Sequence, residues 1–164
     1  MITKENPLTT EYLREGKLCH RKYWDADNFD DLELDKIRQV YGVCICEGKM
    51  VIVLNGKSGT WGLVGGTREK GESIGEALTR EVKEESNNEV LFWKPVGVQQ
   101  VTDSEGNIYY QLRTLCIVRP IGGFEVDPAG TITEVKLIDP KEYKNFFDWG
   151  EIGERIIQRA LSLV

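Results

Sequence analysis

One segment of the chain, residues 73–86, has the pattern of an amphipathic helix, and it stands between stretches with the pattern of β-strands. Ser73 followed three residues later by Glu76 is a capping-box signature, which marks the start of a helix. The helix is predicted to end at Asn87, because Asn tolerates the left-handed backbone turn at a helix end. Four apolar residues at helical spacing form one narrow stripe: Ile74, Ala77, Leu78 and Val82. Such a stripe must pack on another element, and the flanking segments indicate that this element is a sheet.

The strand-like flanks comprise five segments: residues 36–46, 50–54, 90–102, 108–119 and 132–138. The third and fourth should pair antiparallel, because the residues between them have turn composition. Residues 55–71 are predicted to form a glycine-rich loop, and residues 148–163 a closing helix. This order of elements favours an α/β sandwich with a mixed sheet over a regular βαβ repeat.

The first 35 residues differ from the rest, being polar and rich in Asp with scattered aromatic residues. We expect residues 1–35 to form an N-terminal extension with one short helix and irregular structure, followed by a single domain over residues 36–164. A chain of 164 residues accommodates this arrangement and buries enough surface to fold without disulfides or structural zinc.

The four cysteines and the single histidine offer no recognisable zinc site, because no two cysteines form a CxxC pair. Cys44 and Cys46 would share one face of a strand. All four cysteines, which include Cys19 and Cys116, are expected to be small buried thiols in a reducing cytosol. The histidine, His20, is expected to be a solvated side chain without a role.

The formal net charge is −6, from 21 Lys and Arg against 27 Asp and Glu. Proteins that bind the DNA or RNA backbone generally use cationic surfaces, so this class of partner is not expected. An anionic small molecule that binds together with a divalent metal is compatible with this charge. The N-terminus lacks the apolar core of a signal peptide, and the longest purely apolar run, residues 50–54, is far shorter than the ~20 residues that span a bilayer. We therefore expect a cytoplasmic protein with no membrane partner.

Three glutamates lie on one face of the predicted helix, because Glu81, Glu84 and Glu85 are spaced i, i+3 and i+4. A cluster of this kind is ordinarily a solvated face. A hard divalent cation such as Mg²⁺ would remove the repulsion among the carboxylates, since it prefers oxygen ligands and keeps waters for substrate phosphates. Gly65 and Gly66 favour this second interpretation, because a glycine carbonyl can approach a cation closely.

The loop and the helix together resemble the Nudix box, the signature of the Nudix hydrolase family. The signature runs Gly, five residues, Glu, seven residues, Arg-Glu, an aliphatic residue, any residue, Glu-Glu, any residue, Gly and an aliphatic residue. Asn87 replaces the last glycine and Asn88 the last aliphatic residue, and Val90 is expected to supply the lost apolar contact. Val64 stands where a Pro is common, and Trp61 keeps a frequent Trp. Seven of the nine specified positions match, including every charged one: Gly66, Glu72, Arg80, Glu81, Val82, Glu84 and Glu85.

The resemblance covers residues 36–164 and implies a Nudix-like α/β/α sandwich with a mixed, largely antiparallel sheet. It also implies hydrolysis of a diphosphate linkage in a nucleoside diphosphate joined to another group, with Mg²⁺ or Mn²⁺ as cofactor and water as nucleophile. The substrate would be a small phosphorylated molecule derived from a nucleotide, and similar proteins are commonly dimers. By position, Glu72 and Arg80 would hold the metal ligands in place. Those ligands would be the Gly65 carbonyl and the side chains of Glu81, Glu84 and Glu85.

The proton acceptor is expected to be Glu81, which the adjacent Arg80 can orient. Members of the family use either a glutamate of the box or an acid on a loop before the last strands. In this chain Thr131 occupies that loop position, with Asp127 and Glu134 nearby. This departure shifts the expectation toward a glutamate of the box.

Other charged and aromatic residues are weaker candidates. Arg38, Arg68 and Arg113 could meet phosphates, but surface or cross-strand salt bridges are the more ordinary role for each. Four aromatic residues could stack on a base, although large aromatic residues more often simply pack: Tyr23, Trp24, Trp61 and Tyr110.

The main alternative is a catalytically silent Nudix-like module that binds a nucleotide or another phosphorylated ligand, and the intact charged set disfavours it. Isopentenyl-diphosphate isomerase is a third possibility, but its catalysis needs a reactive Cys and a His-rich metal site, which one histidine does not provide. The sequence leaves the substrate open among nucleoside triphosphates, ADP-ribose, nucleotide sugars and dinucleoside polyphosphates.

Overall fold

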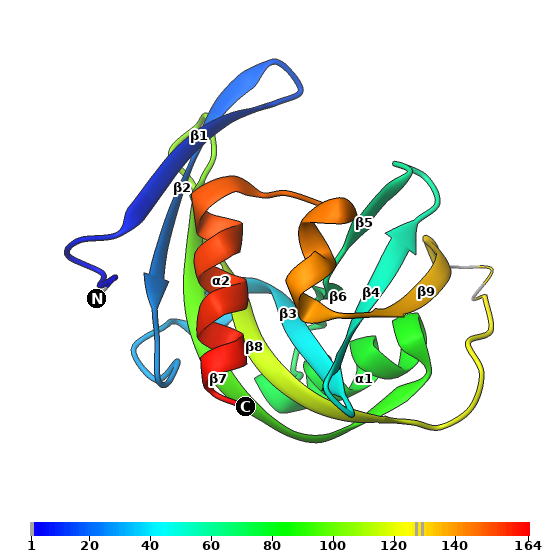
Figure 1. Cartoon of the computed structure of the whole chain (residues 1–164). Helices are drawn as coiled ribbons and strands as arrows, with labels where there is room; N and C mark the ends of the chain where they lie inside the picture. Colours follow the sequence, from blue (N-terminus) through cyan, green and yellow to red (C-terminus); the bar gives the residue numbers. More distant parts are fainter. Residues whose placement is uncertain (1, 127, 129) are drawn as a thin grey trace.

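The computed structural model describes residues 2–126, 128 and 130–164, and it consists of a nine-stranded sheet with one helix packed on each face (Figure 1). The strands are ordered β1-β2-β7-β8-β3-β4-β5, with β6 paired to β3 and β9 to β4. Strands β3 and β8 run parallel, and the other recorded pairs are antiparallel. The predicted sandwich with a mixed, largely antiparallel sheet is therefore confirmed. The elements in chain order are β1 (Leu8–Arg14), β2 (Lys17–Asp25), η1 (Leu34–Lys36), β3 (Ile37–Cys46), β4 (Lys49–Asn55), β5 (Thr60–Gly62), β6 (Val64–Thr67), α1 (Ile74–Ser86), β7 (Asn88–Thr102), β8 (Ile108–Pro120), β9 (Ile132–Ile138), η2 (Pro140–Asn145) and α2 (Gly150–Ser162).

The central strand β3 is buried on both faces, so its side chains alternate between two hydrophobic cores. Val40 and Cys44 pack on the side of α1, with Leu78 of that helix. Val43 packs on the side of α2, with Ile156 of that helix. The two helices therefore cover opposite faces of the sheet, as Figure 1 shows.

Helix α1 begins and ends as the sequence predicts. The Ser73 hydroxyl accepts a hydrogen bond from the Glu76 amide, and the Glu76 carboxylate accepts one from the Ser73 amide, which completes the capping box. Asn87 ends the helix in the left-handed region, at φ 52° and ψ 40°. Asn88 is buried, and its amide donates to the Ser86 hydroxyl at 2.9 Å. Val90 packs against the core on the side of α1, as expected.

The prediction of irregular structure for residues 1–35 is wrong for residues 8–25, which form a β-hairpin that extends the sheet. The short helix expected in this segment is limited to the 3₁₀ turn η1, which begins at Leu34. Strand β2 pairs with β7 from His20 to Asp25, and Tyr23 and Trp24 are buried in opposite cores. The hairpin turns at Glu15 and Gly16, whose φ values are 53° and 77°. A two-residue turn with both φ values positive matches the twist of paired strands.

The segment predicted as a glycine-rich loop, residues 55–71, contains two short strands, β5 and β6. Strand β6 lies beside β3, and Gly65 occurs where a side chain has no room. A Cβ at Gly65 would lie 2.2 Å from the Val40 carbonyl oxygen, and φ is +155° there. The close approach of two backbones therefore requires glycine at this position.

The prediction that the cysteines are buried thiols is also confirmed. The four cysteines are free and buried, and Cys44 and Cys46 face the same core. His20 is about half exposed, with Nδ1 3.4 Å from a Glu11 carboxylate oxygen. Among the described residues, no helix is both long and apolar enough to cross a membrane.

Candidate active site

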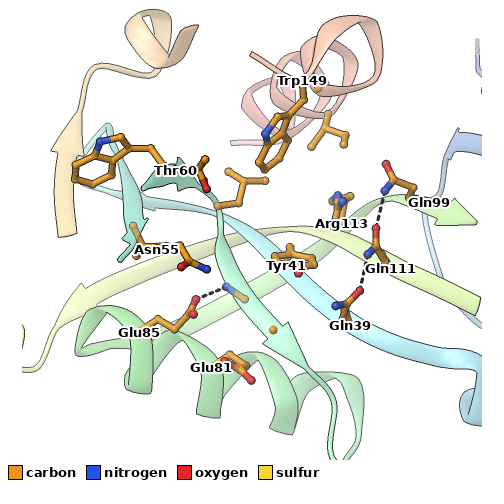
Figure 2. A pocket seen from close by; sticks show the side chains of 18 of the residues that line it. Gln39, Tyr41, Asn55, Thr60, Glu81, Glu85, Gln99, Gln111, Arg113 and Trp149 are labelled. Carbon is orange, nitrogen blue, oxygen red and sulfur yellow. Dashed lines mark hydrogen bonds between the residues drawn. The ribbon is translucent and has the colours of Figure 1, made fainter. Parts of the chain in front are cut away.

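A cavity of about 770 Å³ opens on the α2 side of the sheet, beside the N-terminal end of α2 (Figure 2). Strands β3 and β8 form its floor, with the side chains of Tyr41 and Arg113. Each of these residues lies two positions from a residue of the α2-side core on the same strand, so its side chain points to the same face of the sheet. Strand β6 and helix α1 supply one wall, and Trp149, just before α2, lies across from the floor. The hairpin β1–β2 contributes Thr10 and Arg21. Segments far apart in sequence therefore meet at this one cavity.

One wall of the cavity, here called the acidic wall, consists of Glu81, Glu85, Gly65 and Gly66. The Gly65 amide donates to a Glu85 carboxylate oxygen at 2.8 Å. The Glu81 carboxylate lies against Gly66, since a Cβ added at Gly66 would be 2.8 Å from it. The structure thus places two of the three predicted metal-binding glutamates against the glycine backbone.

Arg80 links the residues around the acidic wall. It donates to both carboxylate oxygens of Glu72 at 2.8 Å and to Glu81 at 2.9 Å. It also donates to the Thr67 carbonyl at 2.9 Å, which ties the helix to the end of β6. The bidentate pair lowers the pKa of Glu72 to about 2, so this carboxylate is charged at neutral pH.

Glu84 is placed differently from Glu81 and Glu85. Its side chain is half exposed, pairs with Arg80 at 3.3 Å and is not among the residues that line the cavity. Within residues 2–126, 128 and 130–164, no three Asp, Glu, His or Cys side chains are gathered closely enough to hold a metal ion as they stand. Repulsion among the three carboxylates, together with the attraction of Arg80, accounts for the position of Glu84 away from Glu81 and Glu85.

The acidic wall is electrostatically unfavourable on its own. Burial, opposed by the hydrogen bond from Gly65 and assisted by the neighbouring Glu81 and Glu84 carboxylates, raises the pKa of Glu85 to about 7. Burial also raises the pKa of Glu81, although Arg80 opposes this. Perturbed carboxyls in a cavity are typical of functional sites. Negatively charged carboxylate oxygens are the type of ligand that a hard divalent cation prefers.

Of the two acids considered as alternative proton acceptors, the structure describes only Glu134. Glu134 is an exposed residue of β9, 4.0 Å from Lys136, and it does not line the cavity, whereas Thr131 does. Asp127 lies outside the described residues. Asp148, which sequence analysis missed, does line the cavity, and its carboxylate accepts a hydrogen bond from the Gly150 amide at 2.9 Å.

The prediction of salt bridges for three arginines is wrong for the described part of the chain, in which none of them forms one. Arg68 donates to backbone carbonyls, among them that of Glu72 at 2.8 Å, and so fixes the loop before α1. Arg38 stacks on Tyr109 at 4.3 Å. Arg113 is buried in the cavity and stacks on Tyr41 at 4.6 Å. Burial lowers the pKa of Arg113 to about 10.

The predicted packing role of the four aromatic residues is confirmed for the two that are buried in the cores, Tyr23 and Trp24. Tyr110 meets Trp24 edge-on at 6.5 Å. Trp61 lines the cavity and contacts Phe146 edge-on at 5.8 Å.

Sequence analysis missed a chain of three glutamine side chains in the floor. Gln99 donates to Gln111 at 2.6 Å, and Gln111 donates to Gln39 at 2.5 Å (Figure 2). The three residues are direct neighbours in the register of β7, β8 and β3. Polar residues within otherwise apolar strands are the only sequence signal for this feature, and their juxtaposition requires the strand register.

Comparison with known proteins agrees with this geometry. The family model described as NUDIX domain matches residues 36–160. A mouse (Mus musculus) protein, 8-oxo-dGDP phosphatase NUDT18, is 32% identical over 112 residues, which cover 63% of this chain and 33% of the mouse protein. The chain thus spans about a third of the length of that relative.

Two solved structures share the fold. The Bacillus subtilis pyrophosphohydrolase BsRppH is 15% identical with a TM-score of 0.69, over 94% of this chain and 97% of that chain. The NUDIX domain of Shewanella oneidensis NrtR, complexed with ADP ribose, is 13% identical with a TM-score of 0.61, over 82% of this chain and 94% of that chain. Because the family model covers most of the chain and the matching segment forms the expected fold, the chain belongs to the NUDIX hydrolase family.

Proposed function

We propose that the cavity hydrolyses a diphosphate linkage in a nucleoside diphosphate joined to another group, with Mg²⁺ or Mn²⁺ as cofactor. The observation that carries this proposal is the acidic wall, where Glu81 and Glu85 line the cavity and both carboxyls have raised pKa values. The likeness to a mouse 8-oxo-dGDP phosphatase supports a substrate derived from a nucleotide.

Glu81, Glu84, Glu85 and the Gly65 carbonyl would hold the cation. When bound, it would supply charge neutralisation at the phosphates and lower the pKa of an attacking water. Enzymes of this family generally use divalent metals, and the oxygen donors of this wall suit them in kind.

In this proposal Glu81 accepts the proton of the attacking water. Its carboxylate faces the cavity, its raised pKa brings it closer to neutral pH, and the hydrogen bond from Arg80 orients it. Glu72 holds Arg80 from the other side, so Arg80 cannot swing away from the helix without breaking the bidentate pair. Glu84, Glu85 and the Gly65 carbonyl would then remain as metal ligands when Glu81 takes up the proton.

The test is a phosphate-release screen over nucleoside diphosphate derivatives, with and without Mg²⁺ or Mn²⁺. We expect turnover of at least one compound only with metal. Glu81→Gln and Glu84→Gln should each lower kcat by about 10²–10⁴-fold, because each removes a proton acceptor or a metal ligand. Lys83→Gln, on the exposed side of the same helix, should leave kcat unchanged.

Turnover like that of wild type in both glutamate variants would contradict the site assignment. Binding of ADP-ribose without turnover at saturating Mg²⁺ would instead favour the alternative, a catalytically silent module that binds a phosphorylated ligand.

A further inference from the structure

Arg113 lies in the floor of the cavity without the partners that a buried guanidinium ordinarily has. Its exposed fraction is 7%, and its Nε and Nη1 atoms are buried with no hydrogen-bond partner among the described residues. Buried arginines are usually paired, because an uncompensated charge is costly to remove from water. The stack on Tyr41 stabilises the cation only in part.

A second cation adds to this unfavourable charge. Arg21 of β2 lines the same cavity and is close enough to Arg113 to lower its pKa further. The Nε atom of Arg21 is also buried without a partner among the described residues, and its guanidinium stacks on Tyr12 at 3.7 Å. In the described part of the chain, neither arginine forms an ion pair with a carboxylate. We call this pair the cationic wall.

The cationic wall and the acidic wall belong to one cavity but are separate. Figure 2 shows Glu81 and Glu85 on the helix along one side, and Arg113 beside the glutamine chain on another, with Tyr41 between them. Burial raises the pKa of Tyr41, and the charges of both walls also act on it: Arg113 lowers this pKa, while Glu85 and Glu81 raise it. A molecule that fills the cavity would therefore contact oppositely charged surfaces at different points.

We propose that Arg113 and Arg21 form an anion subsite for a phosphate group of the substrate that lies outside the hydrolysed linkage. This inference rests on the proposed function, which places the hydrolysed linkage at the acidic wall. A phosphate fits better than the edge of a neutral base, because only an anion compensates two neighbouring guanidinium charges. The substrate class is accordingly a nucleotide derivative with a phosphate beyond the diphosphate that is cleaved.

The subsite gives the N-terminal hairpin a part in substrate selection. Arg21 belongs to β2, and Thr10 of the neighbouring β1 also lines the cavity. The residues that select the substrate thus come partly from outside the segment that matches the family model.

The first arm of the test measures anion binding without metal, by titrating inorganic pyrophosphate into the protein in EDTA. Arg113→Met should weaken binding at least tenfold and Arg21→Met several-fold. Arg119→Met is the matched control, because Arg119 lies on the same strand but is largely exposed and pairs with Glu89. It should bind as wild type does. Equal affinity of wild type and Arg113→Met, or no binding by wild type, would overturn the proposal.

The second arm compares matched substrates with metal present: ADP-ribose against ADP-ribose 2′-phosphate, and dGDP against dGTP. Wild type should prefer the more phosphorylated member of at least one pair by tenfold or more in kcat/KM. Arg113→Met should abolish that preference, so its loss of kcat/KM on the more phosphorylated member should be at least tenfold larger than its loss on the other member. An equal loss on both members would overturn the subsite and indicate that Arg113 only supports Tyr41.

Thermal unfolding separates function from folding. Arg113→Met should have a Tm equal to or above that of wild type, because it removes a buried uncompensated charge. If that variant fails to fold, both measurements are made with Arg21→Met and Arg113→Lys instead. Arg113→Lys should then reduce a tenfold preference in kcat/KM to about threefold or less. Pyrophosphate binding by the cationic wall without turnover of any substrate would refute the proposed function and leave the subsite in place.

Discussion

At the scale of single residues, Glu85 carries the clearest electrostatic penalty. Its pKa is about 7 in the folded chain against an ordinary 4.5, so the folded state binds this proton more tightly. The contribution of the protonated carboxyl to stability is complete below pH 4.5 and is lost as the pH rises through 7. In EDTA, Glu85→Gln should therefore be more stable than wild type at pH 8, by on the order of 1–2 kcal/mol. The difference should vanish near pH 5.

Urea unfolding at pH 5, 6, 7 and 8 measures this directly. Glu76→Gln is unsuitable as a control, because Glu76 closes the capping box, whereas Glu89→Gln removes an exposed carboxylate without touching the cavity. A constant difference between Glu85→Gln and wild type across the whole range would mean that the carboxyl is not buried as described.

At the scale of elements, the site depends on how closely β6 and α1 approach each other. A Cβ at Gly66 would lie 2.8 Å from the Glu81 carboxylate, which is the flexible end of a side chain and can move aside. Gly66→Ala should therefore leave the fold intact while displacing the carboxylate. We expect kcat to fall by about 10²-fold, the scale of a misplaced catalytic group, with little change in Tm.

Gly123→Ala is the matched control, because a Cβ there meets nothing within 4 Å. It should behave as wild type in both measurements. Unchanged turnover in Gly66→Ala would show that the position of Glu81 against β6 has no part in catalysis.

The elements also show what a sequence can and cannot predict. Helix α1 was predictable to within a residue, since its cap, its apolar stripe and Asn87 are all local signals. The hairpin β1–β2 was not, although its Glu15-Gly16 turn has the same residue types as the Glu47-Gly48 turn between β3 and β4. Its outer strand faces solvent and lacks clear alternation, so the pairing with β7 decides its structure. Sequence analysis named Arg113 as a weaker candidate for a phosphate contact, but its burial in the cavity was not predictable, because that depends on the parallel register of β3 and β8.

At the scale of the whole molecule, the segment that precedes the domain matched by the family model is part of the fold, as its hairpin β1–β2 shows. Asp25, at the end of β2, has a side chain that is only 1% exposed and accepts hydrogen bonds from Arg155 of α2 at 3.0 and 2.5 Å. Arg159 lies 4.0 Å away. Asp25→Asn should lower stability by about 3 kcal/mol, because it leaves two arginines without their buried counter-charge.

For a chain of this size, that loss corresponds to a Tm lower by roughly 6–12 °C. Asp27→Asn serves as the control, since Asp27 pairs with Arg159 but is 81% exposed. Its loss should be within about 1 kcal/mol. Equal stability of Asp25→Asn and wild type would mean that the hairpin is not tied to α2 through this pair.

The most direct test of the metal-dependent account is anomalous diffraction from a crystal soaked in Mn²⁺. The account predicts a manganese peak at the acidic wall, within reach of the Glu81 and Glu85 carboxylates, which disappears in Glu85→Gln. A soaked crystal of active protein with no peak at that wall would contradict it.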